Sequence, residues 1–192
     1  MILMGDNGAG KSTFINYILG FYTSSNQHQF LNHFKTHFQP LEQNIFGYSP
    51  EIAMFDANLS SLDYIKSISS FRNVKVDAEK ILKNISLKTS PKTVIREYSK
   101  GMKQRLSLAL AMIGEPKYLI LDEPTSGLDR VGENIIINIL KRDKNKFKYI
   151  ISTHSSKLAI EIGDEVWFLK NGQIIKKFFP KNIEDLEKVL LG

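Results

Sequence analysis

The apolar residues of this chain gather in short runs that alternate with segments of helical spacing. Tyr118–Leu121 and Tyr149–Ser152 are almost continuously apolar, which is typical of parallel strands that are covered on both faces. Stretches at about Lys11–Leu19 and Arg130–Lys141 predict helices between such strands. This alternation predicts an α/β fold with a mostly parallel sheet.

A mainly helical region is predicted in the middle of the chain. A strand is expected at Asn44–Tyr48, and the helices that follow it have Asp63 and Asp77 as their expected N-caps. A further helix is expected directly after Ser99. The segment at about 56–115 is therefore predicted to be a helical insertion in the α/β core.

The last part of the chain predicts a β-hairpin and a closing helix. Val166–Leu169 and Gln173–Lys177 are strand-like runs separated by Asn171 and Gly172, a residue pair that suits a tight hairpin turn. Ile183–Leu191 has amphipathic spacing and predicts a final helix. The hairpin is the antiparallel part of the expected fold.

Composition and charge narrow the class of protein. The 192 residues, 42% hydrophobic and 24% charged, fit one ordinary globular domain over 1–192. There is no cysteine, which removes disulfides and thiolate chemistry and favours a reducing, cytoplasmic location. The net charge of +6 comes from 26 basic and 20 acidic residues that are interspersed, so no nucleic-acid partner is expected. No apolar run approaches the roughly 20 residues that cross a bilayer.

A phosphate-binding pattern, a glycine followed by four residues and then Gly-Lys-Ser, stands at Gly5–Ser12. It lies between the short apolar strand Ile2–Met4 and a predicted helix, as this motif requires. Its small residues allow backbone N–H groups to surround phosphates, Lys11 reaches the β- and γ-phosphates, and the Ser12 hydroxyl ligates Mg²⁺. The predicted ATP-binding residues are Gly5, Asp6, Asn7, Gly8, Ala9, Gly10, Lys11, Ser12 and Thr13.

Two carboxylates follow the buried strand Tyr118–Leu121. Asp122 and Glu123 stand at its C-terminal end, where ligands bind in open α/β sheets. Asp122 is predicted to ligate Mg²⁺ together with Ser12. Glu123 is predicted to orient or deprotonate the attacking water, because phosphoryl transfer depends on positioning and charge neutralisation.

The segment Tyr98-Ser99-Lys100-Gly101-Met102 resembles the signature of the ATP-binding cassette (ABC) family, usually Leu-Ser-Gly-Gly-Gln. The resemblance covers nearly the whole chain and implies a P-loop NTPase fold with a helical signature subdomain and a reduced antiparallel subdomain. It implies that Ser99, Lys100 and Gly101 contact the γ-phosphate held by the other subunit of a homodimer or cassette heterodimer. Lys100 replaces a glycine and Met102 the glutamine, a variation similar to ABC-2 type exporters, and Lys100 could add charge toward a phosphate.

Three further positions keep the motif order of that family. Ser126–Asp129 resembles the D-loop, with Asp129 as its predicted functional residue, and His154 resembles the switch histidine that contacts the γ-phosphate. With Glu123, His154 completes the predicted catalytic set. Glu51 occupies the Q-loop position, where the family usually has glutamine. A carboxylate there would bind Mg²⁺ more strongly than an amide but would repel phosphate oxygens, so we expect retained activity with altered coupling.

The resemblance implies an ATP-binding and Mg²⁺-dependent ATP-hydrolysing subunit that energises a separate transmembrane permease, in an export system. Such a subunit lies on the cytoplasmic face of the membrane as a peripheral protein. Two alternatives stay open: a soluble ABC ATPase that acts on nucleic acid or ribosomes, and a degenerate, non-catalytic regulatory subunit. The intact Lys11, Glu123 and His154 disfavour the second alternative.

Cassettes of this family usually begin some tens of residues before the phosphate loop, with strands and an aromatic residue that stacks on adenine. Only four residues precede Gly5 here. A truncated reading frame is therefore favoured over a reduced cassette, and weak ATP binding with little base selectivity is expected. His28, His33 and His37 raise the question of a metal site, but no third fixed ligand stands beside them, and none is predicted.

Overall fold

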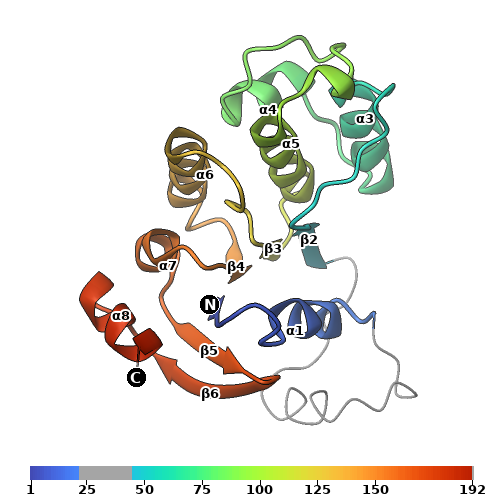
Figure 1. Cartoon of the computed structure of the whole chain (residues 1–192). Coiled ribbons are helices and arrows are strands. Elements are labelled where there is room, and N and C mark those ends of the chain that lie inside the picture. Colours follow the sequence, from blue (N-terminus) through green and yellow to red (C-terminus); the bar gives the residue numbers. More distant parts are fainter. Residues whose placement is uncertain (22–44, 192) are drawn as a thin grey trace.

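The described part of the chain forms a six-stranded sheet with helices on both faces (Figure 1). The computed structural model describes residues 1–21 and 45–191; the three histidines just mentioned lie outside this range. Its elements in chain order are β1 (Ile2–Met4), α1 (Lys11–Ile18), β2 (Phe46–Ser49), α3 (Ser61–Phe71), α4 (Ala78–Asn84), the 3-10 turn η2 (Ile95–Glu97), α5 (Lys100–Met112), β3 (Tyr118–Asp122), α6 (Arg130–Arg142), β4 (Lys148–Ser152), α7 (Ser156–Ile162), β5 (Val166–Lys170), β6 (Gln173–Phe178) and α8 (Ile183–Leu191).

The strand order is β2-β3-β4-β1-β5-β6, and the first five strands are parallel. β1 lies between β4 and β5, with Ile2 opposite both Ile151 and Val166. β6 is the antiparallel edge strand beside β5. The predicted mostly parallel sheet is confirmed, and its topology brings the segments after β1, β3 and β4 to one edge, where ligands bind in such sheets.

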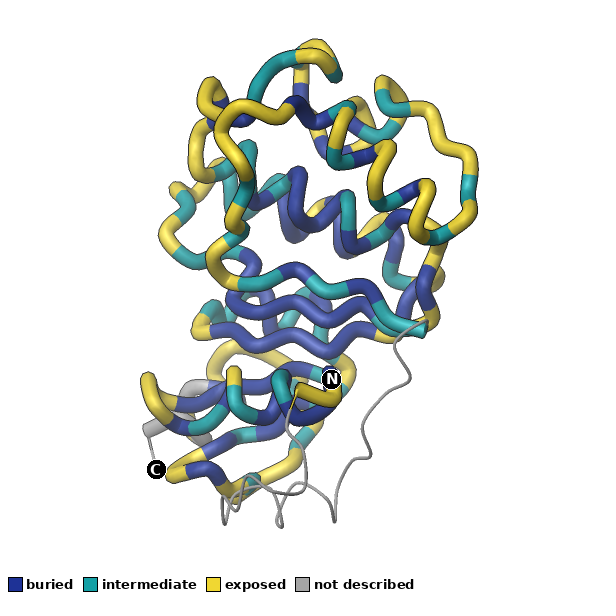
Figure 2. Tube along the Cα trace, turned by 90° about the vertical axis from the view of Figure 1, so that its right-hand side faces the viewer, coloured by how far each residue is buried: buried dark blue, intermediate teal, exposed yellow. Residues whose placement is uncertain are grey.

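The two faces of the sheet bury separate apolar clusters. Leu3 of β1 packs toward Phe14 and Ile15 of α1 on one face. Ile2 and Met4 belong to the larger cluster on the other face, together with residues of α5, α6 and α7. Figure 1 shows α1 on one side of the strands and these three helices on the other, and Figure 2 shows the strands as the most continuously buried part of the trace. Strands covered on both faces explain the continuous apolar runs.

Between β2 and β3 the described chain forms α3, α4, η2 and α5, in the predicted helical region. The predicted N-cap Asp63 is wrong: Ser60 caps α3, and Asp63 is the third helical residue of a capping box whose carboxylate accepts from the Ser60 backbone N–H. From the sequence alone, an aspartate near the start of a helix can be taken either for the N-cap or for the third helical residue of a capping box. Asp77 caps α4 as predicted, and Ser99 caps α5.

β2 is joined tightly to α5. A β-carbon built on Gly47 would lie 1.8 Å from the carbonyl oxygen of Ala111, so only glycine allows the strand to approach the helix this closely. The hydroxyls of Ser49 and Ser107 lie 2.8 Å apart in a buried hydrogen bond. Strand β2 and α5, the helix that begins in the signature segment and is called the signature helix below, therefore form one packed unit.

The C-terminal part combines the predicted hairpin with one element that was not predicted. Asn171 and Gly172 have φ values of 50° and 73°, the left-handed conformations of a tight turn. Helix α7, capped by the Ser155 hydroxyl, was not predicted because seven residues carry too little periodicity; it buries Leu158 and Ile162. None of the described helices has the length and apolarity needed to cross a bilayer.

Candidate nucleotide-binding site

The loop between β1 and α1 has the backbone of an anion-binding turn. Gly5, Gly8 and Gly10 have φ values of 145°, 79° and 100°, conformations that side chains with a β-carbon rarely adopt. Gly10 is the N-cap of α1, and no side chain caps this helix end among the described residues. The first backbone N–H groups of α1 therefore point to the loop without intrahelical partners and favour a negative group there.

Lys11 holds its ammonium group at the centre of this loop. Its Nζ donates to the backbone carbonyls of Gly5 at 2.8 Å and Asp6 at 3.2 Å. The same nitrogen lies 2.9 Å from His154 Nε2 and 3.8 Å from Glu123 Oε1. A buried cation is thus placed between the loop and the two residues predicted to act on the γ-phosphate.

Asp122 lies at the C-terminal end of β3, next to the start of α1. Its Oδ1 accepts from Ser12 Oγ at 3.5 Å and also from the hydroxyl of Ser152 on β4. Ser152 is fully buried, and Asp122 is 6% exposed. The hydroxyl of Ser152 therefore fixes the orientation of a carboxylate that is largely removed from solvent.

Glu123 leaves the end of β3 in a strained backbone conformation. Its φ of 45° is left-handed, which for a non-glycine residue persists only where its surroundings enforce it. Its N–H donates to the backbone carbonyl of Ser152 at 3.1 Å, and its carbonyl accepts from Ser126 N at 2.9 Å. These bonds turn the chain sharply and direct the Glu123 carboxylate toward Lys11.

The Glu123 carboxylate lies beside the side chains of Lys11 and His154 and is largely buried. Oε2 accepts from the backbone N–H of His154 at 3.2 Å, and Oε1 lies 3.2 Å from His154 Nε2. His154 Nε2 can accept from Lys11 in one tautomer or donate to Glu123 in the other, but not both. Burial raises the pKa of Glu123, while His154 and Lys11 act in the opposite direction. Oε1 is buried without a hydrogen-bond partner among the described residues, which leaves one free acceptor in the site.

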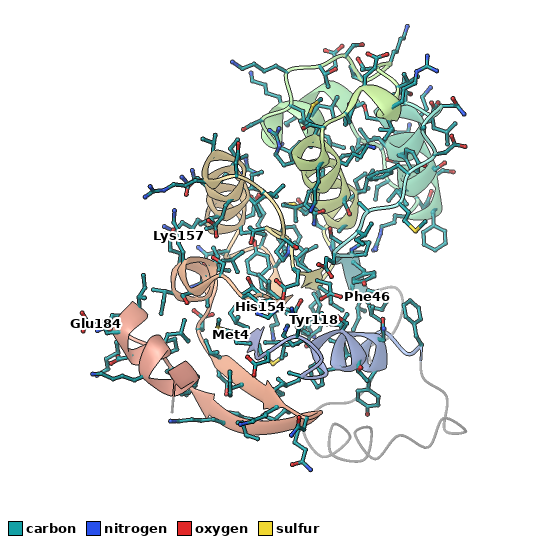
Figure 3. The ribbon with its side chains drawn as sticks, viewed as in Figure 1. Met4, Phe46, Tyr118, His154, Lys157 and Glu184 are labelled. Atoms are coloured by element: carbon teal, nitrogen blue, oxygen red, sulfur yellow. The ribbon has the colours of Figure 1, made fainter. Side chains whose placement is uncertain are left out.

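These side chains surround an open cavity of about 500 Å³. Figure 3 places His154 near the middle of the molecule, between α1 and α7. Glu51 also lines the cavity and accepts from Ser126 Oγ at 3.2 Å. The lining residues are Asn7, Gly8, Ala9, Gly10, Lys11, Ser12, Thr13, Glu51, Glu123, Ser126 and His154. None of these described residues is a phenylalanine, tyrosine or tryptophan.

The predicted signature residues and Asp129 of the D-loop are not brought to this cavity. Ser99 Oγ accepts from the backbone N–H of Met102 at the start of α5. Asp129 Oδ1 accepts from Gly132 N at 2.7 Å and caps α6. Lys100 and Gly101 likewise lie outside the set of lining residues. Within the described chain, the cavity is therefore formed without the signature.

Sequence reasoning missed two serines. Ser152 orients both Asp122 and Glu123, through its hydroxyl and its backbone carbonyl. Ser126 lines the cavity and contacts Glu51, whereas only Asp129 was singled out from this loop. A serine at the end of an apolar strand carries no signal of its own, because its role depends on the neighbouring strand.

Known proteins share this sequence and fold. The family model described as ABC transporter matches residues 1–126. The bacitracin transport ATP-binding protein BcrA of Enterococcus faecalis is 32% identical over 192 residues, covering 97% of this chain and 61% of that protein. The lantibiotic transport ATP-binding protein SrtF of Streptococcus pyogenes is 30% identical over 189 residues, covering 97% of this chain and 82% of that protein.

A solved ATP-binding subunit of an ABC transporter superposes with a TM-score of 0.75 at 25% identity, covering 100% of this chain and 82% of that one. For four of the relatives, this chain spans only 19% to 61% of the relative's length. The family match extends over more than half of the chain and contains the phosphate loop, Asp122 and Glu123. The chain therefore belongs to the ABC transporter family.

Proposed function

We propose that this chain binds ATP in the cavity and hydrolyses it to ADP and phosphate with the help of Mg²⁺. The observation that carries this proposal is the convergence of Lys11, Glu123 and His154, which lie within 4 Å of one another at the phosphate loop. A structural ion cluster would not need a strained backbone at Glu123 or a buried carboxylate oxygen to which no hydrogen bond is assigned among the described residues. Both features support a catalytic function for this carboxylate.

In this proposal the residues of the chain position the phosphates and the attacking water, and they stabilise the charge that develops on the transferred group. The loop N–H groups and Lys11 bind the phosphates, and their positive potential offsets the charge that develops on the transferred group. Glu123 Oε1, to which no hydrogen bond is assigned among the described residues, accepts a hydrogen bond from the attacking water when His154 Nε2 accepts from Lys11. His154 holds the other carboxylate oxygen through its backbone N–H and presents its ring to the γ-phosphate.

Ser12 and Asp122 fit a shared magnesium ion. Two oxygens bound to one Mg²⁺ at about 2.1 Å lie at most about 4 Å apart, and the Ser12 and Asp122 oxygens are 3.5 Å apart. No three His, Asp or Glu side chains gather as a cation site in the described ranges. Phosphate oxygens and water would complete the shell, as is usual for Mg²⁺ at nucleotide sites. The ion would supply charge neutralisation of the phosphates.

Phosphate release from ATP by the purified chain tests this function. We expect turnover that requires Mg²⁺ and stops when the ion is chelated. Asp122→Asn is expected to raise the Mg²⁺ concentration needed for half-maximal rate, because a charged ligand is lost. Turnover that is unchanged by chelation would contradict the assignment of Ser12 and Asp122.

We further propose that two cassettes form a head-to-tail dimer, either of two copies or with a related cassette. Ser99 and Lys100 are exposed, Gly101 is half-buried, and all three lie outside this chain's own cavity, which supports contact with a nucleotide held by a partner. Size-exclusion chromatography of Glu123→Gln with and without Mg-ATP tests this, because blocked hydrolysis should trap the dimer. A variant that binds ATP but stays monomeric would contradict self-association of this chain.

The dimer is proposed to energise a separate membrane permease, in an export system, from the cytoplasmic face of the membrane. The names of BcrA and SrtF, which refer to bacitracin and lantibiotic transport, support this coupling. Affinity purification from detergent-solubilised membranes provides the test. Recovery of an integral membrane protein is expected, and recovery of RNA in its place would favour the nucleic-acid alternative.

A further inference from the structure

Two residues that depart from the family pattern contact consecutive residues of the same loop. Glu51 replaces the usual glutamine, and Lys100 replaces the first signature glycine. Glu51 Oε1 accepts from Ser126 Oγ at 3.2 Å, and Lys100 lies over Gly127. A negative and a positive side chain, contributed by segments about 50 residues apart in the sequence, thus meet the D-loop, Ser126–Asp129.

The Lys100 contact is close and directional. A β-carbon built on Gly127 would lie 2.2 Å from Lys100 Nζ and 3.4 Å from its Cε, so the end of the lysine lies directly against this glycine. Gly127 has a φ of 65°, which identifies the left-handed position of a turn. The residues that follow, Gly101 and Leu128, also lie close together, because a β-carbon built on Gly101 would lie 3.6 Å from Leu128 Cδ2. The start of α5 therefore rests on the D-loop of its own chain.

We propose that Glu51 and Lys100 act together as positioning residues that hold two consecutive residues of the D-loop with opposite charges. The proposal deepens the function proposed above and rests on it for its kinetic consequences. Neither side chain needs to touch the reacting atoms. Their joint effect is to keep Ser126 and Gly127 in place beside Glu123, whose carbonyl accepts from Ser126 N.

The physical reason for coupling is charge balance. Glu51 lines the cavity that would hold phosphates, so its carboxylate alone would repel them. Lys100, which lies against Gly127, offsets that charge. Both side chains are exposed, so their attraction is weak in the free chain and grows when a dimer interface excludes water. Loss of Lys100 alone, which leaves the Glu51 charge unbalanced, is therefore worse than loss of both charges.

A double-mutant cycle tests the pair. Glu51→Gln keeps an oxygen that can accept from Ser126, and Lys100→Met keeps most of the aliphatic stem over Gly127. Glu79→Gln and Lys83→Met, four residues apart on exposed positions of α4, change the same two charges and form the control cycle. kcat and KM for ATP are measured for every variant, together with thermal stability.

Lys100→Met alone is expected to raise KM or lower kcat by about threefold or more, because it leaves the Glu51 charge unbalanced, and the addition of Glu51→Gln is expected to recover most of the loss. The non-additivity should reach at least about threefold, within the range measured for directly coupled residues. The control cycle should be additive, and the thermal stability of all variants should be similar. Additive effects of Glu51→Gln and Lys100→Met on kcat/KM would overturn the pairing.

A second readout does not need turnover. In the nucleotide-free chain, the amides of Ser126 and Leu128 donate to the carbonyls of Glu123 at 2.9 Å and Thr125 at 3.2 Å, so their hydrogen exchange reports the order of the D-loop. Because the attraction between the two charges grows when water is excluded, exchange is compared with each variant placed in the Glu123→Gln background and saturated with Mg-ATP. Exchange should be faster in each single variant than in the parent or the double variant. A wild type without ATPase activity would contradict the proposed function alone, whereas unchanged exchange in both single variants would overturn the pairing even in an active enzyme.

Discussion

At the scale of single residues, Glu123 has the least favourable surroundings in the site. Its side chain is 11% exposed, its φ is left-handed, and burial raises its pKa. The nearby charges of His154 and Lys11 only partly offset the burial of the carboxylate. Such an arrangement costs stability and is typical of groups retained for chemistry.

Replacing Glu123 by glutamine should therefore stabilise the metal-free and nucleotide-free chain at neutral pH. Because the folded protein binds the Glu123 proton more tightly than the unfolded chain does, its favourable contribution is complete below the ordinary pKa of 4.5. This contribution is lost as the pH rises through the raised pKa. Urea unfolding as a function of pH measures it. The advantage of Glu123→Gln should shrink as the pH falls toward 4.5, and a variant less stable than the wild type at pH 7 would contradict this.

Only some residues of the site were predictable from the sequence. The phosphate loop, Asp122 and Glu123 were identifiable because their spacing fits a known chemistry. Ser152 was not, because its function depends on β4 lying beside β3, a contact about 30 residues apart in sequence. The opposed charges of Glu51 and Lys100 were visible as separate departures, but only the fold places both at the D-loop.

At the scale of elements, the contact between β2 and α5 governs where the signature helix stands. Gly47 allows the backbone of α5 to lie close to β2, and the hydrogen bond between the hydroxyls of Ser49 and Ser107 fixes how the two elements align. The parallel strands were predictable because both faces are apolar. Helix α7 and the true cap of α3 were not, because short helices and capping boxes leave ambiguous local signals.

Gly47→Ala should destabilise the fold by about 3 kcal/mol or more, since the new methyl group meets a backbone carbonyl that cannot rotate away. Chemical denaturation measures the change. Gly101→Ala is the matched control: its β-carbon has ordinary space within a helix, so it should be neutral or stabilising by up to about 1 kcal/mol. Equal effects of the two substitutions would show that the strand does not approach α5 so closely.

Ser99→Asn separates the cap of α5 from the proposed contact in the partner. Asparagine caps helices about as well as serine, so the free energy of unfolding should change by less than about 0.5 kcal/mol. ATP turnover should nevertheless fall by tenfold or more, on the order of one lost hydrogen bond to a charged group. If ATP turnover falls only where the free energy of unfolding falls as well, Ser99 acts only as a helix cap.

At the scale of the whole molecule, the cavity offers phosphate contacts but no aromatic lining among the described residues. Binding should therefore depend on the triphosphate and Mg²⁺ far more than on the base. The parallel sheet explains this arrangement, because it presents the phosphate loop, Asp122 and His154 at one edge.

Competition between ATP and GTP measures this property. The two nucleotides should differ in affinity for the 192-residue chain by less than about tenfold, or 1.4 kcal/mol. Tripolyphosphate with Mg²⁺ should compete as well. Tight and adenine-selective binding would mean that residues outside the cavity described above recognise the base.

The central claim, that Glu123 makes this cavity a site of ATP hydrolysis, is tested most directly by one comparison. Phosphate release by the wild type and by Glu123→Gln is measured at saturating Mg-ATP, with nucleotide binding determined on the same preparations. The account predicts retained binding and a turnover reduced by about 100-fold or more, the usual effect of removing a general base. Equal and equally slow hydrolysis by both proteins, with binding intact, would contradict it and leave the chain as a nucleotide-binding subunit without catalysis.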